Sequence, residues 1–131
     1  MSYYNHGHTE IKAVNQLYKG IETPDDLYEA LLHCWTRETC TARLRNKYSE
    51  SNKTAGQCAI TAFLVQDIFG GEIRELDTGR GLHCYNVIDG VAIDLTSEEM
   101  RALSFVMKII LCNRYVKPAW QKPRRANAMS F

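Results

Sequence analysis

The chain has 131 residues, 45% of them hydrophobic, and a formal net charge of +1. This length indicates one domain, which buries roughly two-thirds of the surface of its unfolded chain. The nearly neutral charge argues against a protein that binds nucleic acid or a membrane over its whole surface.

Two helix signals occur in the first 35 residues. A stripe of apolar side chains predicts a short amphipathic helix over residues 11–18, formed by Ile11, Val14, Leu17 and Tyr18. A stronger signal begins at Thr23, which is suited to the N-cap position and is followed by Pro24 and by Asp26 at the third helical position. We therefore expect a second helix from residue 24 to about residue 35.

A polar stretch over residues 41–55 follows, without clear periodicity. A loop of this length is often functional, so it either forms one wall of a site or is a solvated connector. Arg37 and Glu38 precede it, and we expect them to hold this loop in place rather than to line a cleft.

The central helix is predicted over residues 59–69, because apolar residues recur at helical spacing and stop at Gly70 and Gly71. Cys58 would lie in its first turn. Unpaired amides and partial positive charge at a helix start favour the thiolate, which is the nucleophilic form of cysteine. Cys58 is therefore the candidate nucleophile.

Three antiparallel strands are predicted after this helix. Residues 72–76 alternate between polar and apolar, and residues 82–88 and 91–95 flank Asp89-Gly90, a typical two-residue hairpin turn. This register places His83 and Asp94 on one face as diagonal neighbours, roughly 7–8 Å apart at the backbone. An imidazole and a carboxylate can meet across that distance.

The C-terminal quarter is predicted to begin with a helix capped by Thr96, with Glu99 three residues later. No acidic residue follows Glu99, so the tail could meet an acidic partner; its basic residues are Arg101, Lys108, Arg114, Lys117, Lys122, Arg124 and Arg125. Trp120, among these charges, is either a partner contact or an anchor to the core.

The chain has five cysteines, an odd number, and their spacing is not that of a zinc site. Together with the lack of an apolar leader, this favours free thiols in a reducing cytoplasm over a disulfide framework. No membrane-spanning run is present. Cys34, Cys40, Cys84 and Cys112 are interpreted as structural. His6 and His8 are expected to be solvated rather than to bind a metal, and no cofactor is expected.

Several of these segments together resemble the YunG-like family of small bacterial proteins over about residues 27–100. The matching segments are Trp35-Thr36-Arg37-Glu38-Thr39, Gly56-Gln57-Cys58, Val65-Gln66-Asp67, Phe69-Gly70-Gly71, His83, Tyr85-Asn86, Asp89-Gly90 and Ile93-Asp94-Leu95-Thr96. Cys84 departs from the pattern, where an aromatic residue is expected, and the segment after Met100 shows no resemblance.

The order of Cys58, His83 and Asp94 is also similar to papain-like and transglutaminase-like enzymes. This resemblance implies an α+β fold with a papain-like (cysteine proteinase-like) core, in which the helix bearing the cysteine packs on a small antiparallel sheet, with additional N- and C-terminal helices. We expect one domain over 1–131, with a family-like core at about 24–100 and a C-terminal helix and basic tail at 97–131.

The predicted function is cysteine-nucleophile chemistry on an amide, peptide or isopeptide bond of a protein or peptide, by hydrolysis, deamidation or acyl transfer. Cys58 would attack, His83 would transfer the proton and Asp94 would orient the imidazole. The Cys58 amide and, by analogy with the glutamine of papain-like enzymes, the Gln57 side chain would stabilise the oxyanion. The alternatives are an inactive papain-like domain that binds a protein partner, and a metal site of Cys84, His83 and Asp94.

Overall fold

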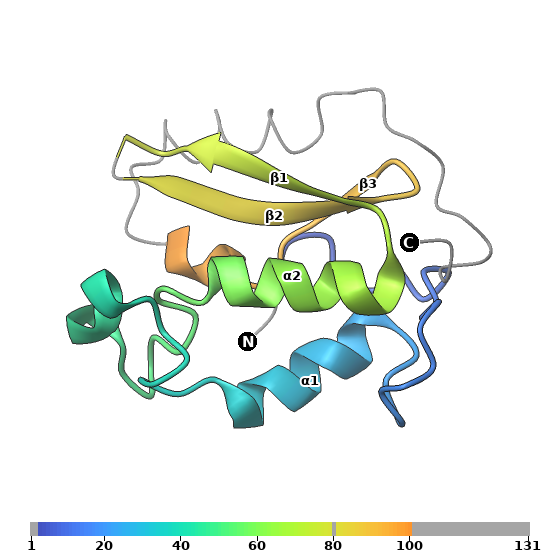
Figure 1. The fold of residues 1–131 in the computed structure, drawn as a ribbon, viewed down its shortest axis with the longest axis horizontal. Helices are drawn as coiled ribbons and strands as arrows, with labels where there is room; N and C mark the ends of the chain where they lie inside the picture. Colours follow the sequence, from blue (N-terminus) through green and yellow to red (C-terminus); the bar gives the residue numbers. More distant parts are fainter. Residues whose placement is uncertain (1–2, 80, 101–131) are drawn as a thin grey trace.

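A computed structural model describes residues 3–79 and 81–100 (Figure 1). In this part of the chain the element order is α1 (Pro24–Cys34), the 3-10 helix η1 (Ala42–Lys47), α2 (Cys58–Phe69), β1 (Glu72–Asp77), β2 (Leu82–Ile88), β3 (Val91–Ile93) and the 3-10 helix η2 (Ser97–Met100). The strands form one antiparallel sheet in the order β1-β2-β3, and α2 lies along one face of it (Figure 1). The fold is therefore α+β, with the cysteine-bearing helix on a small antiparallel sheet, as predicted.

Local signals in the sequence give rise to these elements. Thr23 accepts a hydrogen bond from the Asp26 amide, and the Asp26 carboxylate bonds back to the Thr23 amide, which completes the predicted capping box of α1. At the C-terminal end of α2, Gly70 and Gly71 have φ angles of 77° and 81°, a left-handed conformation that favours glycine. The chain can therefore reverse directly from α2 into β1.

The hairpin between β2 and β3 also forms as predicted. Asp89 and Gly90 have φ angles of 52° and 83°, as a two-residue turn of the mirror-image type requires, and Ile88 pairs with Val91. Successive side chains of β2 leave opposite faces of the sheet. We call the side covered by α2 the helix face and the other side the far face.

Buried side chains identify the residues on each face. On the helix face, Asn86 donates a hydrogen bond to the Ala62 carbonyl of α2 at 3.0 Å, and Ile88 joins the main hydrophobic cluster. On the far face, a second cluster is formed by Leu76, Tyr85, Val87 and Ala92, with Tyr4 packed against it. Since His83 alternates with Cys84, its ring belongs to the far face with Tyr85.

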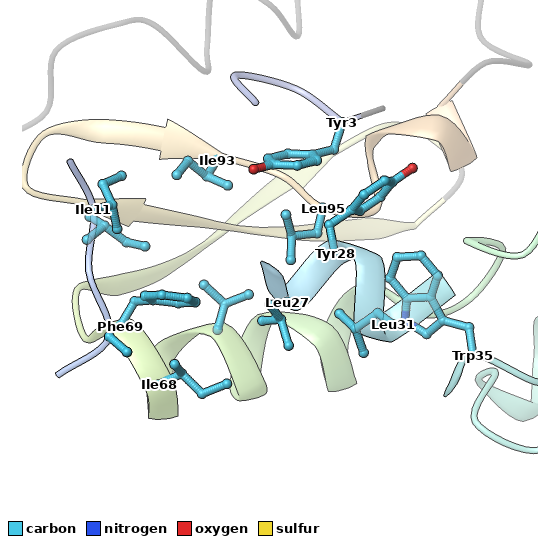
Figure 2. Close-up of a cluster of buried hydrophobic side chains, with 13 residues drawn as sticks. Tyr3, Ile11, Leu27, Tyr28, Leu31, Trp35, Ile68, Phe69, Ile93 and Leu95 are labelled. Carbon is cyan, nitrogen blue, oxygen red and sulfur yellow. The ribbon is translucent and has the colours of Figure 1, made fainter. Parts of the chain in front are cut away.

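The main cluster joins both α-helices to the helix face (Figure 2). Its side chains include Leu27, Tyr28 and Leu31 from α1, Val65, Ile68 and Phe69 from α2, and Ile93 and Leu95 after the hairpin. Trp35 closes one end, where its indole nitrogen donates to the Thr61 hydroxyl at 3.0 Å. This hydrogen bond ties the end of α1 to the first turns of α2.

The predicted helix over residues 11–18 is wrong. Ile11 is buried in the main cluster, but Leu17, on the same predicted stripe, is 85% exposed. The amides of Val14 and Asn15 donate to the Ile68 carbonyl at 2.8 and 3.1 Å, where they satisfy one of the open carbonyls at the end of α2. Tertiary hydrogen bonds therefore replace the internal bonds that this segment would need as a helix.

Only the start of the predicted C-terminal helix lies among the described residues, where η2 follows Thr96. The hydroxyl of Thr96 donates to Asp94 at 3.0 Å, and its predicted role as the helix cap stays a prediction. The rest of the predicted helix, the basic tail, Cys112 and Trp120 lie outside the described residues. The prediction of one domain over 1–131 stays a prediction.

Candidate functional site

The first part of the candidate site is the buried pair of His83 and Asp94 on the far face. His83 Nε2 and Asp94 Oδ2 are 2.6 Å apart, and the two side chains are 3% and 1% exposed. The other carboxylate oxygen of Asp94 accepts from both the amide and the hydroxyl of Thr96, each at 3.0 Å. The contact expected from the hairpin register therefore forms, and Thr96 holds the carboxylate from its other side.

Cys58 begins α2, and its position over the sheet follows from how α2 runs. The chain reverses between α2 and β1 and again between β1 and β2, so α2 and β2 run in the same direction. Four residues of α-helix rise about 6 Å and two residues of strand about 6.6 Å. Since Ala62 lies against Asn86, Cys58 comes to lie against Cys84 on the helix face.

The thiols of Cys58 and Cys84 are in contact. A hydrogen bond joins the two side chains, and both residues are half-buried. Burial, together with the neighbouring Cys58 and Glu75, raises the pKa of the Cys84 thiol to about 11, and the nearby His83 opposes part of this rise. Cys84 therefore keeps its proton at neutral pH and can donate it in a hydrogen bond to the Cys58 sulfur.

These two contacts lie on opposite faces of the sheet. Leu76, which belongs to the far-face cluster, is paired with His83, whereas Glu75 is paired with Cys84. The structure therefore brings His83 together with Asp94 and Cys58 together with Cys84, and the triad of Cys58, His83 and Asp94 stays a prediction. The hairpin register fixes which residues share a face with Asp94, but not which face α2 covers.

Sequence reasoning missed the contact of Cys84 with Cys58, because only a structural role was expected for Cys84. The signal was present in the strand pattern, because Cys84 alternates with His83 and shares a face with Asn86 and Ile88. The same alternation argues against the alternative metal site, since Cys84 diverges from His83 and Asp94. Within residues 3–79 and 81–100, no group of three His, Cys, Asp or Glu side chains is placed to hold a metal ion.

Gln57 does not suit the predicted role as an oxyanion donor. Its side chain is fully buried, its Nε2 donates to the Thr36 carbonyl at 3.0 Å, and its Oε1 accepts from the Thr39 hydroxyl at 2.8 Å. Both ends of the amide are therefore used to join α2 to the segment after α1. The backbone amide of Cys58, in the open first turn of α2, is better placed to stabilise an oxyanion.

The segment before Cys58 is fixed by close packing at Gly56. Its φ is 69°, and a Cβ atom there would lie 2.4 Å from the buried Cys40 sulfur. The Gly56 carbonyl also accepts from the Thr41 amide at 2.9 Å. Only glycine fits this position without a shift, so the approach to Cys58 depends on it.

Arg37 holds the polar loop in place, as expected. Its guanidinium donates to the Arg45 and Tyr48 carbonyls and lies over the Tyr48 ring, 5.4 Å from the ring centre. Glu38 contributes its carbonyl, which accepts from Arg45 at 3.4 Å. These contacts support the structural interpretation of both residues over a role in lining a cleft.

Comparison with known proteins places the chain among a group of relatives. A family model described as "YunG protein" matches residues 23–129, which extends the resemblance past the expected boundary near residue 100. A Bacillus subtilis (strain 168) protein, described as "Uncharacterized protein YunG", is 38% identical over 72 residues, which cover 55% of this chain and 58% of that protein. The alignment thus spans a little over half of the relative. No solved structure gives a significant match.

No helix in the part of the chain that the structure describes has the length and apolar character needed to cross a bilayer.

Proposed function

Because the chain belongs to the YunG family, whose name specifies no reaction, we propose its function from its own site: Cys58 is a nucleophile that attacks the acyl carbon of an amide, peptide or isopeptide bond. The observation that carries this proposal is the half-buried Cys58 thiol at the start of α2, hydrogen-bonded to Cys84. Hydrolysis, deamidation and acyl transfer share this first step.

The chemistry begins with the sulfur of Cys58. This residue begins α2, where the backbone amides of the first turn are open, and the Cys84 thiol, protonated at neutral pH, donates a hydrogen bond to the Cys58 sulfur. Attack forms a bond between sulfur and the acyl carbon, and the carbon–nitrogen bond breaks as the amine takes a proton from solvent. Water or a second amine then releases the acyl group from the thioester.

In this proposal His83 and Asp94 stabilise the fold, because they lie on the far face and hold the strands behind Cys84. The papain-like form of the proposal, with His83 as the base, needs the imidazole on the helix face. A shift of β2 by one residue would exchange the faces of all its side chains. That shift would also move Ile88 out of the main cluster, which disfavours it.

The second candidate is a non-catalytic domain that binds a protein partner. Ile60 and Phe63 favour it, since they lie three residues apart on α2, where neighbouring side chains share a face, and are 52% and 65% exposed. Exposed apolar pairs on a helix are a common element of protein interfaces. This candidate makes no demand on Cys58, so thiol reactivity separates the two.

Limiting iodoacetamide at neutral pH, followed by peptide mass spectrometry, tests the proposal. Cys58 should be alkylated before the other cysteines, and Cys84→Ala should slow its alkylation at least about threefold through loss of the hydrogen bond. Cys34, which is exposed on α1, serves as the internal reference for an ordinary thiol. His83→Gln should leave the ratio of Cys58 to Cys34 alkylation unchanged.

The same experiment identifies the competing outcomes. Alkylation of Cys58 no faster than of Cys34 would refute the nucleophile and favour the binding domain. A large loss of Cys58 reactivity in the folded His83→Gln variant, with no loss in Cys84→Ala, would restore the papain-like arrangement in place of ours.

A further inference from the structure

The contact between Cys58 and Cys84 joins two thiols of different character. Cys58 lies at the start of α2, and Cys84 lies 26 positions later in the central strand of the sheet. Both are half-buried, so a small molecule can approach them, whereas Cys40 is buried beneath Gly56. Cys34 is exposed at the end of α1, a different element from those that carry the pair. The structure therefore distinguishes one pair among the described cysteines.

We propose that Cys58 and Cys84 form a reversible disulfide, in which Cys58 is oxidised first by a hydroperoxide and Cys84 resolves the product. This inference deepens the proposed function, because the disulfide would switch off the nucleophile, but its formation does not depend on any acyl chemistry. Its physical basis is that α2 and β2, joined by the hydrogen bond from Asn86 to the Ala62 carbonyl, hold the two thiols within hydrogen-bonding reach of each other.

The first step uses the electron pair of the Cys58 thiolate. The sulfur attacks the terminal peroxide oxygen, an S–O bond forms, the O–O bond breaks, and the leaving oxygen takes a proton to become water or an alcohol. Sulfur is oxidised to sulfenic acid and the peroxide is reduced. Cys58 takes this role because it lies in the open first turn of α2, whereas Cys84 lies in the central strand and burial raises the pKa of its thiol.

The second step uses Cys84. Its sulfur attacks the sulfenic sulfur, the S–S bond forms, the S–O bond breaks, and the departing hydroxide leaves as water with the proton of Cys84. Because Cys84 holds its proton at neutral pH, it is a poor first target for peroxide but is already in contact with the oxidised sulfur. A dithiol reductant reverses the product by thiol–disulfide exchange.

Treatment of the full chain with stoichiometric hydrogen peroxide, followed by non-reducing peptide mapping, tests this proposal. The expected result is a Cys58–Cys84 linked peptide, the loss of two free thiols and two hydrogen atoms from the intact chain, and full recovery with dithiothreitol. The link closes a loop across α2 and two strands, so it should raise Tm by roughly 10 °C.

Cys84→Ser provides the resolving-cysteine control, and Cys40→Ser the matched control at a cysteine outside the pair. Without Cys84, oxidised Cys58 should be trapped by dimedone or gain further oxygen, whereas Cys40→Ser should form the same linked peptide as the parent chain. Circular dichroism verifies that both variants are folded. If a variant does not fold, the non-reducing peptide map of the parent chain still tests the proposal.

Three results would overturn the proposal: a linked peptide from another pair of cysteines, stable sulfinic acid at Cys58 in the parent chain, or recovery of both thiols unchanged. Slow iodoacetamide labelling of Cys58 in a chain that still forms the linked peptide would refute only the proposed acyl chemistry. Fast labelling without the linked peptide would refute only the disulfide.

Discussion

The two faces of the small sheet use polar groups in opposite ways. On the far face, His83 and Asp94 are buried and bonded to each other, and Thr96 occupies the second carboxylate oxygen. On the helix face, Cys58 and Cys84 are half-buried and share a hydrogen bond. Saturated, buried networks hold a fold together, whereas partly open groups can react. The comparison assigns stability to the far face and reactivity to the helix face.

The largest expected effect comes from removal of the Asp94 carboxylate. Asp94→Ala removes the buried carboxylate that binds His83 and accepts from the Thr96 amide and hydroxyl, so the free energy of unfolding should fall by about 3–5 kcal/mol. Urea denaturation followed by circular dichroism measures this loss. The exposed Glu29→Gln change is the control and should be nearly neutral.

The Asp94→Ala variant also tests whether the far face influences the reactivity of Cys58. At temperatures where Asp94→Ala remains folded, the rate of Cys58 alkylation relative to Cys34 should match that of the parent chain. A drop of tenfold or more would show that the far face controls the thiol, which contradicts the division of roles.

A smaller loss is expected from Gly56→Ala, which alters the segment leading into Cys58. The new methyl group would meet the Cys40 sulfur at 2.4 Å, at a φ of 69° that alanine disfavours, so we expect a cost of about 2–3 kcal/mol. Thermal unfolding measures it. Because Cys40→Gly removes the sulfur, the double variant should recover the part of the cost that comes from the clash, and no recovery would rule out that clash as the cause.

Alkaline pH should weaken the fold through Cys84. Its pKa is about 11 in the folded chain and 9.0 as its ordinary value, so the fold favours the neutral thiol. That contribution is fully present below about pH 9 and is lost as the pH rises towards 11. Urea denaturation of the parent chain and of Cys84→Ser across this range should show a steeper decline for the parent.

Tyrosines contribute to the same decline in both chains, since burial raises the pKa of Tyr28 to about 12. The difference between the two chains, rather than either slope, therefore reports Cys84. Equal slopes would mean that the Cys84 thiol ionises as readily in the folded chain as in the unfolded one.

The smallest effect is expected at Thr23, which belongs to neither face. Thr23→Ala removes the hydrogen bond to the Asp26 amide, and the free energy of unfolding should fall by about 1 kcal/mol. Chemical denaturation measures this change, and Thr23→Ser should restore most of it. The alkylation of Cys58 should stay at the parent rate, because the cap of α1 does not touch the thiol pair.

Local signals in the sequence predicted most of the fold. The capping box at Thr23, the helix ending at Gly70 and the hairpin at Asp89 each depend on residues close together in the chain, and each forms. The same register led from the hairpin to the contact between His83 and Asp94. Predictions that were marked by a cap, a helix stop or a hairpin turn were therefore confirmed.

The errors arose where distant segments meet. The apolar stripe from Ile11 to Tyr18 has helical spacing, but its backbone amides bind the carbonyl of Ile68 instead. Likewise, the sequence places His83 and Cys84 on opposite faces without stating which of the two faces α2 covers. Tertiary packing determines both the conformation of residues 11–18 and the face of β2 that α2 covers. In this structure α2 covers the face that carries Cys84.

The burial of Tyr3, Ile11 and Ala13 has a practical consequence for domain boundaries (Figure 2). The family model begins at residue 23, but Tyr3 donates a hydrogen bond to Asp25, and Ile11 packs in the cluster with Phe69. An expression plasmid trimmed to the family boundary would uncover apolar surface and the Ile68 carbonyl. Recombinant protein should begin before Tyr3, or aggregation of the trimmed chain will be mistaken for a property of the family.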